Sequence, residues 1–253
     1  MGELEDLIKL ALEGNSISKE GLPKGPVPVN FGIVLFPGFQ ALDAFGPLDA
    51  LNTLSNIFPL NLHIVAATLD PVSTKAPHTP PSRSDFAQSI NPTHTFASAP
   101  PLDVLLVPGG LGAIAPEIQT AIDFVARVYP SLKYLFTVCN GASIAARAGV
   151  LDGKRATTNK MYWGHETGQR PQVKWVSHAR WVVDENVWTT SGVSAGLDGI
   201  FAFIAAVYGE EAAEKVSNIL EYERHRDPSW DPYAELYGLR DAGLLEVVDG
   251  PRE

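Results

Sequence analysis

Cysteine is almost absent from this chain, which has only Cys139 among its 253 residues. One cysteine cannot form an internal disulfide, and such chains are typical of a reducing compartment. The longest strongly apolar stretch, residues 200–208, is far shorter than the roughly 20 residues that a membrane helix needs. The first residues are acidic, whereas a secretory signal or transit peptide would be basic. The sequence therefore predicts a cytoplasmic protein with no membrane partner.

Positive charge is also scarce, with 19 Lys and Arg against 29 Asp and Glu and a formal net charge of −10. A surface this acidic repels phosphate backbones, which argues against nucleic acid as a partner. The six histidines show no paired spacing typical of a metal site. Neither a Gly-x-Gly-x-x-Gly fingerprint nor a Walker loop is present. We expect no metal and no nucleotide cofactor.

What the sequence does contain is an alternation of short apolar strands with helical patterns. Apolar strands that alternate with helices predict an α/β fold with a parallel sheet covered on both faces. The predicted strands are 31–36, 60–69, 102–107, 134–138, 173–176, 180–183 and 187–190, and the predicted helices are 41–54, 117–129, 140–148 and two within 194–224.

The domain organisation follows from composition. Residues 1–29 are expected to form an N-terminal arm with a helix over 2–13 and a Gly- and Pro-rich linker, residues 30–226 the α/β domain, and residues 227–253 a C-terminal extension. The proline-rich segment Pro71–Pro101 is expected to be a loop or small hairpin. It either lines or caps a site or is a surface loop without a chemical role.

Cys139 lies where a predicted strand passes into a helix of small residues, in Phe136-Thr137-Val138-Cys139-Asn140-Gly141-Ala142-Ser143. This pattern is typical of a nucleophile elbow, in which a tight turn exposes the reactive side chain. The positive end of a helix dipole would lower the pKa of the thiol. The alternative is a buried core cysteine without reactivity.

Two further features follow predicted strands. Asp43 lies at a helix start among apolar residues, where burial would raise its pKa and suit it to proton transfer. The alternative is a carboxylate that only stabilises the positive end of the helix. The backbone N–H groups of Gly109 and Gly110, with that of Asn140, would stabilise a developing negative charge, unless the glycines only form a turn. Because ligands bind beyond the carboxyl ends of parallel strands, we expect these groups to meet Cys139.

Two other polar residues are weaker candidates for the site. His165 follows the Thr157-Thr158 stretch and either approaches the pocket or faces solvent. Asp198 stands at a helix start and is expected to cap or brace the fold rather than react.

A set of motifs in this chain resembles, in order, those of the ThiJ/PfpI superfamily, and most of all those of its isonitrile hydratases. The resemblance covers about residues 30–222 and is carried by Phe36-Pro37-Gly38-Phe39, Leu42-Asp43, Gly46-Pro47, Val107-Pro108-Gly109-Gly110, Val138-Cys139-Asn140-Gly141-Ala142, the run 148–158 and Thr190-Ser191-Gly192-Val193-Ser194-Ala195-Gly196-Leu197-Asp198. It implies a flavodoxin-like three-layer sandwich and a homodimer.

The resemblance also implies roles for individual residues. Cys139 would be the nucleophile, Asp43 its carboxyl partner, and the amides of Gly110 and Leu111 would lie near the sulfur. Asn140 departs from the pattern, since the hydratases usually have threonine there and protease-like relatives have histidine. Asparagine cannot act as a general base, which disfavours a peptidase.

Three hypotheses for function remain. The first is a cysteine-dependent lyase that hydrates isonitriles, which are its small-molecule substrates, to N-substituted formamides with Asp43 as acid and base. The second is a glyoxalase-like or biosynthetic tailoring enzyme that uses the same cysteine. The third is a non-enzymatic redox sensor in which Cys139 is oxidised.

Overall fold

A seven-stranded sheet forms the centre of the computed structural model, which describes residues 18, 23, 25–76 and 84–239. The strand order is β10-β11-β7-β6-β1-β2-β5, and all neighbours are parallel except β10 and β11. This confirms the mostly parallel α/β sheet. The strands are β1 (Asn30–Val34), β2 (Asn61–Ala66), β5 (His94–Thr95), β6 (Val104–Val107), β7 (Tyr134–Thr137), β10 (Trp181–Asp184) and β11 (Val187–Thr190).

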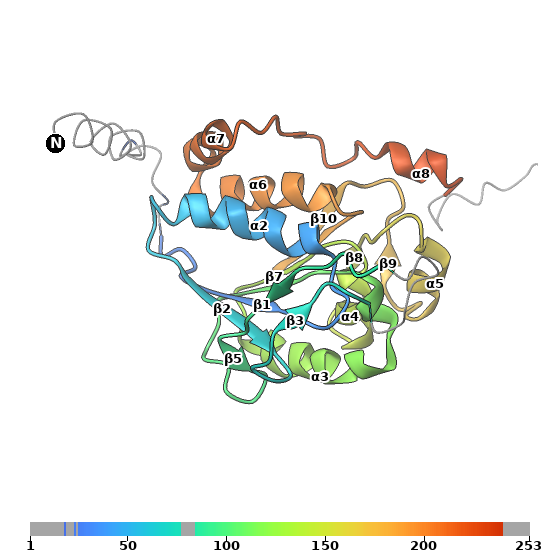
Figure 1. The fold of residues 1–253 in the computed structure, drawn as a ribbon. Helices are drawn as coiled ribbons and strands as arrows, with labels where there is room; N and C mark the ends of the chain where they lie inside the picture. The colour runs from blue at the N-terminus through green and yellow to red at the C-terminus, as the bar shows by residue number, and fades with distance from the viewer. Residues whose placement is uncertain (1–17, 19–22, 24, 77–83, 240–253) are drawn as a thin grey trace, which may run out of the picture.

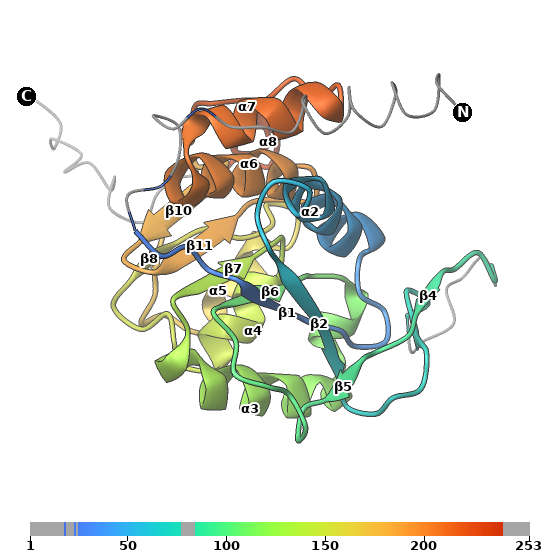
Figure 2. The ribbon, with the colours of Figure 1, turned by 90° about the vertical axis from the view of Figure 1, so that its left-hand side faces the viewer.

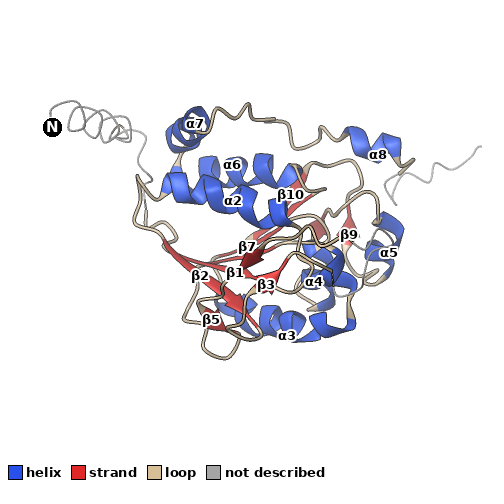
Figure 3. Ribbon diagram, viewed as in Figure 1, coloured by secondary structure: helices blue, strands red, loops and turns tan. Residues whose placement is uncertain are grey.

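Helices cover both faces of this sheet and complete a three-layer, flavodoxin-like sandwich (Figures 1 and 3). One layer contains α2 (Ala41–Leu54), α6 (Ala195–Tyr208) and α7 (Glu210–Ile219), which pack against one another. The other contains α3 (Gln119–Val128) and α4 (Gly141–Arg147). Figure 2 shows the sheet running between the two layers.

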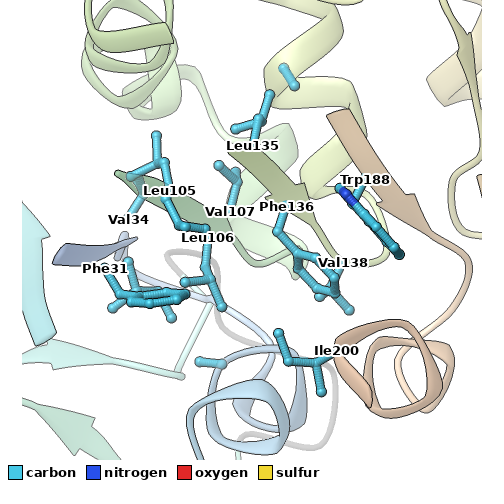
Figure 4. Close-up of a cluster of buried hydrophobic side chains, with 14 of the residues drawn as sticks. Phe31, Val34, Leu105, Leu106, Val107, Leu135, Phe136, Val138, Trp188 and Ile200 are labelled. Carbon is cyan, nitrogen blue, oxygen red and sulfur yellow. The ribbon is translucent and has the colours of Figure 1, made fainter. Parts of the chain in front are cut away.

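The hydrophobic core lies on both faces of the sheet. All four residues of β6 are buried, as expected for a strand with helices above and below it. Phe136 of β7 and Ile200 of α6 point toward one another across the interface between the sheet and the layer that contains α6 (Figure 4). The core therefore fixes α6 over β7, the strand that leads to Cys139.

Several short elements were not predicted by periodicity. In the Pro71–Pro101 segment, β3 (Val72–Ser73) pairs with β4 (Ser89–Ile90) as the expected small hairpin, but β5 adds an unexpected edge strand to the main sheet. The strand predicted over 173–176 is present as β9 (Lys174–Trp175), but it lies outside the main sheet and pairs with the unexpected β8 (Arg155–Ala156) in a second small sheet. Further short helices are η1 (Leu111–Ile114), η2 (Pro116–Ile118), η3 (Tyr129–Ser131), α5 (Trp163–Gly168) and α8 (Pro232–Leu236).

Two further points concern helices: the predicted N-terminal helix and the possibility of a membrane-spanning helix. The helix expected over residues 2–13 lies outside the described residues. Among the residues that the structure does describe, no helix has the length and apolar character to span a bilayer.

Candidate active site

Cys139 lies at the turn between β7 and α4 in a left-handed backbone conformation, with φ of 56°. This conformation costs a non-glycine residue about 1–3 kcal/mol and is concentrated at functional sites. The backbone holds it from two sides: the Cys139 N–H donates to the Ser191 carbonyl at 2.9 Å, and Thr158 Oγ1 donates to the Cys139 carbonyl at 3.1 Å. Gly141 completes the bend, because a Cβ there would lie 2.2 Å from the Val107 carbonyl oxygen. The tight strand-to-helix turn matches the one expected from the sequence, but the exposed side chain expected of a nucleophile elbow is not seen.

Asp43 comes from the first turn of α2 and faces this sulfur. The Asp43 carboxyl and the Cys139 thiol are close enough for each to affect the pKa of the other, and Asp43 Oδ2 accepts the Gly109 N–H at 2.9 Å. The residue is 1 % exposed, and Oδ1 is buried without a donor from the described residues. Burial raises the pKa of Asp43 to about 7, although the hydrogen bond from Gly109 and the interaction with Cys139 oppose this shift. At neutral pH the carboxyl can therefore both give and take a proton.

The exposure and the pKa of the Cys139 thiol differ from the prediction. The sequence predicts an exposed sulfur with a lowered pKa, but Cys139 is only 6 % exposed, and burial followed by the nearby Asp43 charge raises its pKa. Interactions of the sulfur with the N–H of Asn140 and the side chain of Asn159 lower the pKa and counteract the shift only in part. The α4 dipole is therefore outweighed by burial and by a like charge. At neutral pH the site therefore favours a protonated thiol beside a carboxyl that is readily protonated.

The two glycine amides also differ from expectation. Gly109 N–H is bonded to Asp43, and Gly110 N–H donates to Asn140 Oδ1 at 2.7 Å. Because both N–H groups already donate to side chains, neither is free to stabilise a developing negative charge on a substrate, which was the predicted role. In this structure they have a structural role instead. Gly109 is confined by close contacts, since a Cβ there would lie 2.2 Å from Asn140 Oδ1 and 3.0 Å from Asp43 Oδ2. These glycines hold the carboxyl and the asparagine in place.

Of the two remaining predicted binding residues, Asn140 is buried next to Cys139, whereas the side chain of Leu111 is exposed. Asn140 is buried, its backbone N–H reaches the Cys139 sulfur, and its Nδ2 donates to the Gly110 carbonyl at 3.2 Å. Asn140 therefore links the sulfur to the loop after β6. Leu111 begins η1, and its side chain is 54 % exposed.

A pocket of about 290 Å³ lies near the Cys139–Asp43 pair, and its lining includes neighbours of the pair but neither Cys139 nor Asp43 itself. Its position follows from three shared residues: Asn159 contacts the sulfur, Ser191 accepts the Cys139 N–H, and Leu42 precedes Asp43. The pocket has the size of a small-molecule site with apolar walls and a few polar groups. Its lining consists of Leu42, Asn159, Lys160, Met161, Arg180, Ser191, Gly192, Val193, Ser194, Ala195, Tyr233 and Tyr237.

Comparison with known proteins places this geometry in a family. The profile of the DJ-1/PfpI family matches residues 31–207. The chain belongs to the DJ-1/PfpI family. It is 33 % identical over 231 residues to the isonitrile hydratase of Pseudomonas putida, and the match covers 89 % of each chain.

Other members of the DJ-1/PfpI family are also similar. The crystal structure of a ThiJ/PfpI family protein from Pseudomonas syringae superposes with a TM-score of 0.66 at 28 % identity, covering 85 % of this chain and 84 % of that one. The HTH-type transcriptional regulator GbdR of Pseudomonas aeruginosa is 27 % identical over 89 % of this chain, which spans 60 % of that regulator. The family thus includes both an isonitrile hydratase and regulators of transcription.

Three polar residues at or next to this pocket were not identified from the sequence. Asn159 contacts the sulfur, Lys160 is a buried lysine in the pocket wall, and Asp231 pairs with it at 3.3 Å. Buried Lys and Asp are rare unless paired, but a sequence does not show which charges are buried. The only signal was that Asn159 and Lys160 follow the Thr157-Thr158 motif.

The remaining candidates lie outside the pocket. His165 is exposed on α5 and does not line it. Asp198 is buried, pairs with Arg180 and accepts hydrogen bonds from Tyr222 Oη at 2.8 Å and the His225 N–H at 2.9 Å. The prediction that Asp198 braces the fold is confirmed. No described residue of Pro71–Pro101 lines the pocket.

Proposed function

We propose that this DJ-1/PfpI protein is a hydro-lyase that adds water to an isonitrile, R–N≡C, and releases the N-substituted formamide. The observation that carries the proposal is the buried pair of Cys139 with a carboxyl of pKa about 7, near a largely apolar pocket. The similarity to an isonitrile hydratase supports it. The neutral, apolar substrate suits a pocket that has few uncommitted charges.

Protonation begins the reaction. The protonated Asp43 gives its proton to the terminal carbon of the isonitrile, which becomes electrophilic. The carboxylate that remains takes the proton of the Cys139 thiol as the sulfur attacks that carbon. The product is a thioimidate, R–N=CH–S–Cys139, and all atoms of the thiol and the isonitrile are retained in it.

Water then completes the cycle. Asp43, which now carries the thiol proton, first protonates the thioimidate nitrogen, and its carboxylate then removes a proton from the water molecule that attacks the carbon. The C–S bond breaks as the new hydroxyl becomes the formamide carbonyl, and the hydroxyl proton passes to the sulfur. The formamide R–NH–CHO leaves, and Cys139 recovers its thiol. In a variant of this route Asp43 activates water directly and the cysteine only polarises the substrate. The two routes differ in whether a covalent intermediate forms.

The raised pKa and the burial of Cys139 argue against the redox sensor, because oxidation requires an accessible thiolate, whereas in the proposed hydration Asp43 takes the thiol proton as the sulfur attacks. Asn140 in place of a histidine argues against a peptidase. The second candidate is a domain that binds a small molecule without turning it over, which the similarity to transcriptional regulators supports. A glyoxalase-like reaction on the same cysteine remains a weaker alternative.

The experiment is incubation with cyclohexyl isocyanide and measurement of N-cyclohexylformamide. We expect turnover by the wild type, and loss of turnover with Cys139→Ala and with Asp43→Asn. His165→Ala is the matched control, since that side chain is exposed outside the pocket. Full turnover by Cys139→Ala would refute the covalent route. No turnover by the wild type would refute hydration, and lactate formed from methylglyoxal would then support the glyoxalase-like alternative.

We further propose that the protein acts as a cytoplasmic homodimer. Sedimentation of the purified chain tests the dimer, and a monomer at micromolar concentration would contradict it.

A further inference from the structure

The segment after α7 runs back along the helical layer to α8 (Figure 1), and two residues of this part of the chain, Tyr233 and Tyr237, line the pocket. It follows the part of the chain that matches the family profile, which ends at residue 207. Two contacts hold it on the way: Arg180 N–H donates to the Pro228 carbonyl at 2.7 Å, and the Arg180 guanidinium lies 5.2 Å from the centre of the Trp230 ring. The segment is thereby fixed to the domain.

Asp231 anchors the start of α8 to the pocket wall. Its Oδ2 accepts the Ser191 hydroxyl at 2.9 Å and pairs with Lys160 Nζ at 3.3 Å, while its Oδ1 accepts the Tyr233 N–H at 2.9 Å. Both charged side chains are nearly inaccessible, with 2 % and 1 % exposure for Lys160 and Asp231. Ala234, which is part of α8, is fully buried and lies on the side of the helix that packs against the domain. One carboxylate therefore sets the position of α8 relative to the pocket.

This anchor places two aromatic rings on the pocket. Tyr233 and Tyr237 are four residues apart, which puts them on one side of the helical turn, and both line the pocket. They are 47 % and 45 % exposed. Leu42 and Met161 line the same pocket and are 42 % and 62 % exposed, so exposed apolar surface gathers at its mouth. Such surface is what a bound apolar group would cover.

We propose that Tyr233 and Tyr237 are specificity-determining residues that hold the organic substituent of the substrate and favour cyclic or aromatic groups over short alkyl groups. This inference rests on the proposed function. In this proposal the isonitrile carbon approaches Cys139 from the side of Asn159 and Ser191, the lining residues that interact with Cys139, and its substituent extends toward α8. Two flat rings offer a cyclic group contact area that a methyl group cannot use.

The test compares kcat/KM for cyclohexyl, benzyl and methyl isocyanide in the wild type, Tyr233→Leu and Tyr237→Leu. We expect the cyclohexyl-to-methyl ratio to fall on the order of tenfold in each variant, in line with the effect of lost contacts in an apolar pocket. Leu236→Ala is the matched control, because Leu236 lies on the same helix, is 69 % exposed and does not line the pocket. It should keep the wild-type ratio.

Several outcomes would overturn the proposal. A wild type that does not prefer the cyclic substrates overturns it, whether or not the variants fold. So does an unchanged ratio in folded Tyr233→Leu and Tyr237→Leu, or an equal change in Leu236→Ala. A change of oligomeric state without a change of ratio would show that a second copy covers these rings instead.

A failure of the proposed function gives a different result. If the wild type turns over no isonitrile, the same proteins are tested for binding of N-cyclohexylformamide and N-methylformamide by calorimetry. A cyclohexyl preference that both tyrosine variants lose supports the pocket assignment without hydration. Equal binding of the two formamides rejects it.

Discussion

Asp43→Asn should stabilise the protein above neutral pH while it removes the proposed activity. The folded protein holds the pKa of Asp43 at about 7 against an ordinary value of 3.8, because burial disfavours the charged carboxylate. This difference corresponds to roughly 4 kcal/mol of unfolding free energy, as an upper limit. Asparagine keeps an oxygen that can accept the Gly109 N–H. The substitution therefore removes the charge and retains the hydrogen bond.

The pH dependence follows from the direction of the shift. Below about pH 4 the carboxyl is protonated in both states, so the charge of Asp43 has no effect on stability. Between about pH 4 and 7 the unfolded chain ionises first, and the wild type loses stability as pH rises. Above about pH 7 the whole loss is present. The variant should thus exceed the wild type by a few kcal/mol at pH 8 and by almost nothing at pH 4.

Urea unfolding of both proteins at pH 4, 6 and 8 measures this difference. Asp103→Asn is a control of opposite sign: burial opposes ionisation of Asp103, but the N–H groups of Asn30 and Val29 and the amine of Lys133 lower its pKa overall. That variant should be destabilised above about pH 4. The reasoning fails if Asp43→Asn is less stable than the wild type at pH 8, or if its advantage does not grow with pH.

Further predictions concern the same site. If protonated Asp43 starts the reaction, kcat/KM should fall about tenfold per pH unit above pH 7, and a flat profile to pH 9 would contradict this. The folded protein should react with iodoacetamide much more slowly than the urea-unfolded chain, since burial raises the pKa of Cys139; equal rates by intact mass would contradict the burial. Asp231→Ala should cost about 3–5 kcal/mol in urea unfolding because it leaves Lys160 buried without its carboxylate, and a loss below about 1 kcal/mol would show that the pair contributes no more than a surface ion pair.

The sequence predicted the centre of the site because that centre is made of strand ends. Cys139 and Asp43 follow β7 and β1, and the carboxyl ends of parallel strands meet at one edge of the sheet. The periodicity of β1, β6 and β7 was sufficient to place both residues. The glycine turns were found by the same argument, although not their bonded state.

The rest of the site depends on contacts between distant segments. Asp231 reaches Lys160 across 71 residues of chain, and no periodic pattern connects them. The two-residue strands, such as β5, are too short to show an alternation. The pKa of Cys139 depended on the balance between a helix dipole and burial, and the sequence supplies only the dipole. These are tertiary effects, so local patterns could not reveal them.

The engaged amides of Gly109 and Gly110 have a consequence for the chemistry that this site can favour. Attack on an ester or amide carbonyl leaves a full negative charge on oxygen, and here these two neighbouring backbone donors are already occupied by side chains. An isonitrile activated by a proton passes instead from a cation back to neutrality, and it makes no such demand. We infer that the loop after β6 biases this scaffold against hydrolysing acyl groups and toward carbon centres that become reactive on protonation.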